Sequence, residues 1–143
     1  MACQHTVLDS GTVRLEFTTS TPKLHEMRAT YAPGSPPPPA HLHPAQSERF
    51  EVHEGVLVFV VDGIESTVEA GQAIDVAAGA VHQVHNPGQV PAVVTWQTRP
   101  ALRTADFHLA VHDARESGDL TRLLAVVEEY ADVFRLAPQP VGG

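Results

Sequence analysis

The chain contains very little cysteine and lysine, and it has no long apolar run. Cys3 is the single cysteine among 143 residues, which excludes an intramolecular disulfide and a zinc site built on cysteine. Lys23 is the single lysine, and 9 Lys and Arg stand against 17 Asp and Glu, for a net charge of −8. A basic footprint for nucleic acid or an anionic membrane is therefore missing. The apolar runs are also too short to span a bilayer.

The first ten residues contain neither a basic region nor an apolar stretch, so the sequence predicts no signal peptide and a cytoplasmic location. Hydrophobic residues make up 43% of the chain and charged residues 18%, which is enough apolar side chain for a core. We predict a single domain over residues 1–143. Its barrel core covers residues 7–100 approximately, and a helical appendage covers residues 104–135 approximately.

The first two thirds of the chain are typical of short β-strands. Residues 24–31 alternate between two faces, and residues 49–61 are rich in strand-forming side chains. Gly55 predicts a bend or bulge, and Asp62-Gly63 predicts a tight hairpin. Further turn signals follow about every ten residues, which favours a sandwich or barrel.

After Pro100 the apolar residues recur at helical spacing. The first predicted helix follows Thr104 and the second follows Asp119, and both residues are expected to be N-caps. Ser117-Gly118 fits the break between the helices. The apolar face of the second helix continues as far as Phe134, and we expect both helices to pack onto the strands. The tail over residues 138–143 is expected to fray.

Four consecutive prolines at residues 36–39 precede the most informative histidines. Such a run favours a stiff polyproline II segment rather than a helix or an inner strand. Two interpretations stay open: a surface connector, or a rigid lip beside a pocket.

A group of potential metal ligands follows this run. His41 and His43 are two residues apart, so an extended chain places both imidazoles on one face. Glu48 lies five residues beyond His43, and His82 is far along the chain. Three neutral imidazoles and one carboxylate suit a divalent transition metal with open coordination positions. Gln46 shares the strand face of Glu48 and is an alternative ligand, or a residue that hydrogen-bonds the substrate.

The spacing of these residues closely resembles the two-part signature of the cupin superfamily, in its small single-domain bacterial form. Two positions depart from the pattern, since Ser35 and Ala77 stand where the family has glycine and proline, and both affect turns rather than ligands. The residues that match the signature are His41, His43, Glu48 and Gly55 in its first part and Gly71, Gly79, His82 and Asn86 in its second.

The resemblance implies an all-β fold, the cupin double-stranded β-helix (jelly-roll) barrel, with two C-terminal α-helices. It also implies one divalent transition metal per chain, which is Fe, Mn, Ni or Zn. The ligands would be His41, His43, Glu48 and His82, and Glu48 would also be the catalytic base.

Strand parity predicts a mostly apolar pocket around the metal. The side chains expected to line it are Met27, Tyr31, Phe50, Val52, Val84 and Trp96. The remaining histidines carry weaker expectations. His53 and His85 should point outward, His25 lies at the core edge or reaches the cavity, and His108 and His112 have helical zinc spacing without a third ligand.

Three functions fit this site. The favoured one is dioxygenase-type oxidation of a small aromatic or polyketide-like metabolite. The second is non-redox chemistry by a zinc or nickel cyclase, isomerase or lyase, similar to the polyketide cyclases among small cupins. The third is a metal-anchored small-molecule binding module. A homodimer is expected, with a small-molecule substrate and neither nucleic acid nor membrane as partner.

Overall fold

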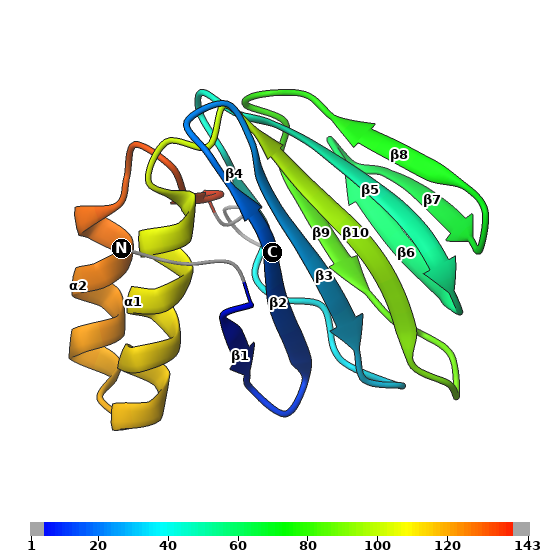
Figure 1. Ribbon diagram of the computed structural model, residues 1–143, viewed down its shortest axis with the longest axis horizontal. Helices are drawn as coiled ribbons and strands as arrows, with labels where there is room; N and C mark the ends of the chain where they lie inside the picture. Colours follow the sequence, from blue (N-terminus) through cyan, green and yellow to red (C-terminus); the bar gives the residue numbers. More distant parts are fainter. Residues whose placement is uncertain (1–4, 139–143) are drawn as a thin grey trace.

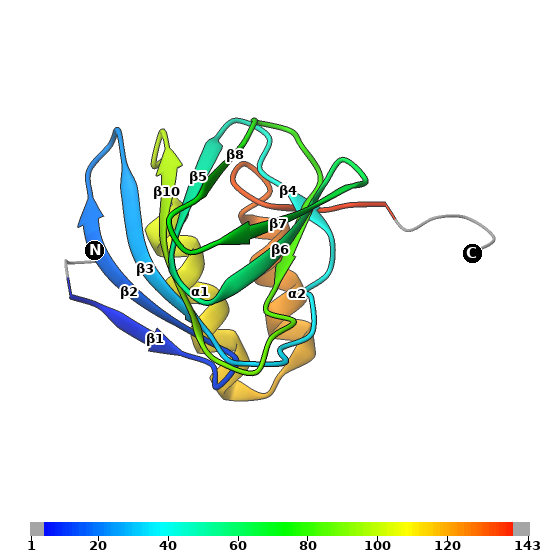
Figure 2. The ribbon, with the colours of Figure 1, turned by 90° about the vertical axis from the view of Figure 1, so that its right-hand side faces the viewer.

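Two facing β-sheets and two helices make up the computed structural model, which describes residues 5–138 (Figures 1 and 2). The first sheet has six strands, in the order β1 (Val7–Asp9), β2 (Val13–Ser20), β3 (His25–Tyr31), β10 (Ala92–Arg99), β5 (Ser47–Glu54) and β8 (Ala73–Val76). The second has five, in the order β11 (Arg135–Leu136), β4 (His41–Leu42), β9 (His82–His85), β6 (Val56–Val61) and β7 (Ile64–Glu69). All strand pairs are antiparallel, and the predicted jelly-roll is confirmed.

The core lies between the two sheets. Alternate residues of β5 and β6 turn inward, and Phe50, Leu57 and Phe59 are at most 1% exposed. The rings of Phe50 and Phe59 meet at 4.9 Å across the core. A second, smaller cluster fills the space between the six-stranded sheet and the helices, around Leu8, Phe17 and Met27.

Gly55 makes the predicted bend between β5 and β6. Its φ of +75° lies in the left-handed region, and a Cβ there would meet the carbonyl oxygen of Pro91 at 2.7 Å. The register of β10 against β5 shifts beside this point, between Val93 and Val94. Asp62 and Gly63 both have positive φ, as the predicted two-residue hairpin requires.

Helix α1 (Thr104–Ser117) packs against the sheet through the second cluster, and α2 (Leu120–Glu129) follows it (Figure 1). Asp119 is the N-cap of α2, as predicted, and its side chain accepts from the Arg122 amide at 3.2 Å. The expectation for Thr104 is wrong: Thr104 is the first residue of α1. Its hydroxyl instead accepts a hydrogen bond from the Gln46 amide at 2.7 Å.

The predicted extent and packing of the second helix are also wrong. Helix α2 ends at Glu129, and the chain then turns back so that β11 pairs with β4. No residue of α2 is buried, and the helix packs on α1 rather than on the strands; Leu120 is 67% exposed. In the part of the chain that the structure describes, no helix is long and apolar enough to cross a membrane. Residues 139–143 of the expected frayed tail lie outside the described range.

Candidate metal centre

The three predicted histidines come together where β4 meets β9. His41 on β4 is the direct register partner of His82 on β9, and His43 follows β4 by one residue. Their ligand nitrogens all lie within 4.8 Å of one another. The proline run is attached to β9 beside this site, because the Pro38 carbonyl accepts a hydrogen bond from the Gln83 side-chain amide at 2.7 Å. Residues more than 40 positions apart in the chain therefore meet at one point.

Each of these imidazoles is oriented by a backbone carbonyl at its Nδ1. A proton on Nδ1 leaves the Nε2 lone pair free, which is the form in which histidine binds a metal. The Nδ1–oxygen pairs are His41 with Pro39 at 3.1 Å, His43 with Val133 at 2.7 Å, and His82 with Ala80 at 2.9 Å.

Glu48 completes the group from β5. Its Oε1 lies 3.2 Å from His43 Nε2 and 2.9 Å from His82 Nε2, and Glu48 is only 3% exposed. Its Oε2 accepts a hydrogen bond from the Trp96 indole N–H at 2.6 Å. Neither Glu48 Oε1 nor His43 Nε2 makes a well-aligned hydrogen bond, although both atoms are buried. Two buried atoms that can ligate a metal and that face each other without a hydrogen bond fit a bound cation better than a closed hydrogen-bond network.

The protonation states agree with metal binding. Burial favours the neutral carboxyl, but the close imidazoles of His43 and His82 outweigh burial and hold the pKa of Glu48 below its usual range. Burial lowers the pKa of His41 to about 4, so its imidazole is neutral at pH 7. The pKa of His43 is raised because Glu48 outweighs the effect of burial. A cation bound at this point would be a positively charged partner for the Glu48 carboxylate.

Gln46 is buried beside this group, with its amide nitrogen turned elsewhere. That nitrogen lies 2.8 Å from the carbonyl oxygens of Pro100 and Ala101 and 2.7 Å from the Thr104 hydroxyl, so its two N–H groups are shared among three acceptors. The side chain thus ties the start of β5 to the linker before α1. Its Oε1 is buried without a hydrogen-bond partner.

An aromatic cover over the site was not predicted. The Phe134 ring stacks on the His41 ring at 4.8 Å with an interplanar angle of 22°, and Phe107 stacks on Phe134 at 4.9 Å. The sequence contained one signal, the apolar Phe134, but its spacing assigned it to the face of a helix. The return of the chain after α2 places it over the metal site instead.

Of the predicted pocket residues, four lie in the tightly packed barrel core, and Trp96 packs against them from its edge. Met27 is on the inner face of β3, as predicted, but it packs into the second cluster with Leu8 and Phe17. The four core residues are Tyr31, Phe50, Val52 and Val84.

The other histidines divide between the second cluster and the surface. His25 is fully buried, and its ring lies 4.6 Å from Phe17 and stacks on His108 at 6.2 Å. His53 is exposed, as predicted, and contacts the Thr95 hydroxyl at 2.6 Å. His112 pairs with Glu116 at 3.8 Å on the same helix, while the His108 ring contacts the Trp96 ring at 5.4 Å.

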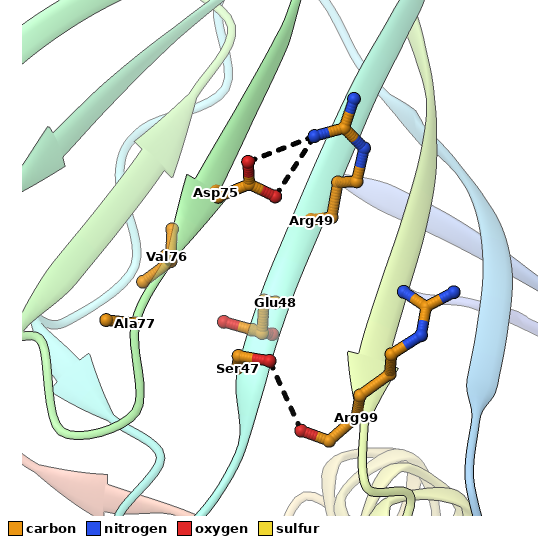
Figure 3. A pocket seen from close by; sticks show the side chains of 7 residues that line it. All are labelled: Ser47, Glu48, Arg49, Asp75, Val76, Ala77 and Arg99. Atoms are coloured by element: carbon orange, nitrogen blue, oxygen red, sulfur yellow. Dashed lines mark hydrogen bonds and ion pairs between the residues drawn. The ribbon is translucent and has the colours of Figure 1, made fainter.

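A surface hollow of about 360 Å³ lies over β5 and β8, and Glu48 is the one residue of the histidine and carboxylate group among those that line it (Figure 3). Its exposed rim includes Arg49, which pairs with Asp75 at 3.0 Å, and Arg99. The Glu48 side chain lies behind β5 in this view, and none of the three histidines lines the hollow. The two arginines therefore remain outside the metal centre.

The fold and this histidine group define the class of protein. The family model described as a cupin domain matches residues 27–98, about half of the chain, so the chain belongs to the cupin family. Tetracenomycin polyketide synthase protein TcmJ of Streptomyces glaucescens is 38% identical over 60 residues, which are 42% of this chain and 40% of that protein. The chain thus matches less than half the length of this curated relative.

Solved structures share the fold at low sequence identity. An RmlC-like cupin from Shewanella frigidimarina superposes with a TM-score of 0.62 and 19% identity, covering 71% of this chain and 89% of that one. A sugar phosphate isomerase of the cupin superfamily from Silicibacter pomeroyi gives a TM-score of 0.54 and 22% identity, over 62% and 60% of the two chains. At such identity, these likenesses extend to the fold alone.

Proposed function

We propose that this cupin is a metal-dependent enzyme that acts on a small, enolisable metabolite of aromatic or polyketide type, with dioxygenase-type oxidation as its reaction. The observation that carries the proposal is that the ligand nitrogens of three histidines and one ionised carboxylate converge. Among these atoms, His43 Nε2 and Glu48 Oε1 lack hydrogen bonds. The partial similarity to a polyketide synthase protein supports the substrate class.

The chain's own residues would hold and shield the reacting group. His41, His43, His82 and Glu48 would hold the metal, which when bound supplies oxygen chemistry if it is iron, manganese or nickel, or Lewis acidity if it is zinc. Glu48 is ionised and can accept a proton from an enolisable C–H or O–H. Phe134 and Phe107 cover one side of the site with apolar rings, which suits a planar aromatic substrate.

Non-redox cyclisation, isomerisation or elimination is the second candidate. The ionised state of the Glu48 carboxyl supports it, because a carboxylate beside a Lewis acid can move a proton without an oxidant. A metal-anchored binding module would use the same ligands without turnover.

The first experiment is elemental analysis of the purified protein, followed by O₂-uptake and product assays on phenols and 1,3-diketones. We expect one metal per chain, lost in His41→Ala and His82→Ala and kept in the surface control His53→Ala. Glu48→Gln retains the three histidines, so it should still take up metal, more weakly than the wild type, and lose rate. Stoichiometric zinc with product but no O₂ uptake would select the second candidate. Bound metal without turnover of any substrate would support the binding module. Full metal occupancy in both histidine variants would refute the assignment of these residues as ligands.

A further inference from the structure

A row of buried polar side chains crosses the six-stranded sheet beside the metal centre. Thr98 on β10 is the direct register partner of His25 on β3 and of Glu48 on β5. Side chains at directly opposed positions have Cβ atoms about 4.5–5.5 Å apart. Thr98 therefore lies between the buried histidine and the metal-site carboxylate, and all three residues are at most 3% exposed.

Several polar atoms in this row have no hydrogen-bond partner. They are His25 Nε2, Thr98 Oγ1 and, at the start of β5, Gln46 Oε1. Two of these residues use their other polar atom, since His25 Nδ1 lies 3.3 Å from the Ser20 hydroxyl and the Gln46 amide nitrogen is bonded to the linker. A buried polar atom without a partner costs stability, so three on neighbouring positions indicate a site for a ligand group.

The chemistry of these atoms selects the ligand. Gln46 Oε1 only accepts, whereas the threonine hydroxyl both donates and accepts. His25 is neutral at pH 7, because burial lowers its pKa to about 4, and its ring can donate or accept according to tautomer. Arg49 is turned outward onto Asp75, so this arginine does not face the row. The three groups carry no charge at pH 7 and offer both donors and acceptors, so the row matches a neutral O–H group.

We propose that His25, Thr98 and Gln46 form a polar subsite beside the metal centre that binds a hydroxyl group of a neutral phenol or enol. The inference rests on the proposed function, which places the reacting end of the same molecule at the metal. Helix α1 adds ring surface next to the subsite, because His108 stacks on His25 and meets Trp96 edge-on at 5.4 Å. The subsite therefore combines hydrogen bonding with aromatic contact.

Calorimetric titration of the zinc-loaded protein tests the subsite with 1,3-dihydroxynaphthalene and its dimethyl ether as probes. We expect the diol to bind at least about tenfold more tightly, because the ether lacks the donor that Gln46 Oε1 needs. Thr98→Val removes the unpaired hydroxyl at nearly constant volume. It should weaken diol binding about tenfold, leave the zinc content unchanged, and maintain or raise the melting temperature.

The matched control is Thr95→Val, on the same strand but contacting the exposed His53, and it should bind the diol like the wild type. Equal affinity for diol and ether, or no binding of either, would overturn the subsite, and so would unchanged diol binding in folded Thr98→Val. Failure of the proposed function looks different. The wild type would then hold no zinc, and the preference for the diol, with its loss in Thr98→Val, would persist in the metal-free protein.

Discussion

Replacing Trp96 by phenylalanine removes one hydrogen bond from the metal centre and keeps an aromatic ring in place. The indole N–H donates to Glu48 Oε2 at 2.6 Å, and the indole ring stacks on Phe50 at 5.3 Å. The other carboxylate oxygen faces His43 and His82. The hydrogen bond to Oε2 thus fixes the orientation in which Oε1 faces the two histidines. The substitution removes this hydrogen bond and leaves Oε2 free to move.

The size of the effect follows from the charge on the acceptor. A hydrogen bond to a charged group contributes roughly 1.5–3 kcal/mol. Since each 1.4 kcal/mol corresponds to about a tenfold change in affinity, zinc binding should weaken about 10- to 100-fold in Trp96→Phe. Loss of an outer hydrogen-bond partner of a metal ligand has effects of the same order.

The assay is competition for zinc between the metal-free protein and a chelating indicator at pH 7.5. Gln97→Leu is the matched control, because its amide also donates to a carboxylate, that of Glu26 at 2.8 Å, from the next position of β10. The control should bind zinc within about twofold of the wild type, as expected for a bond remote from the metal. Unchanged zinc affinity in folded Trp96→Phe would refute the claim that this hydrogen bond positions Glu48 as a ligand.

Three further predictions concern stability, measured by chemical unfolding of the metal-free protein. Gly55→Ala should lower the free energy of unfolding by about 2–4 kcal/mol, through a left-handed φ and a backbone clash at 2.7 Å. The neutral form of His25 is favoured in the fold, where its pKa is about 4 against 6.5 unfolded, so its contribution is complete above pH 6.5 and is lost as the pH falls towards 4. Between pH 7 and pH 4 the free energy of unfolding should therefore fall by up to about 3 kcal/mol more in the wild type than in His25→Asn. Phe134→Ala should cost about 2 kcal/mol, because its partly buried ring stacks on His41.

Each of these has a result that contradicts it. Gly63→Ala shares the positive φ but meets nothing within 4 Å, so an equal loss in both glycine variants would mean that the clash contributes nothing. Parallel pH curves for wild type and His25→Asn would mean that the buried imidazole titrates normally. Unchanged stability in Phe134→Ala would mean that the stacked ring adds no packing energy to the site.

The barrel and the candidate metal ligands could be predicted from the sequence, because strand alternation, turn residues and ligand spacing are visible in it without the fold. Alternation gives the strand faces, Gly55 and Asp62-Gly63 mark turns that need positive φ, and His41 and His43 share a face by spacing alone. His82 was included in the predicted site because a barrel can bring distant strands together and because it matches the cupin signature, and its register pairing places it beside His41.

The surroundings of these residues could not be predicted from the sequence. The Val133 carbonyl orients His43 across 90 positions of sequence, and Phe134 covers His41 because the chain reverses after α2. A helical period cannot reveal such a reversal, since it describes one element and not where the next one goes. The row of His25, Thr98 and Glu48 depends on the pairing of β3, β10 and β5, which are far apart in sequence. Strand parity predicts which face a side chain takes, whereas strand order decides which side chains become neighbours.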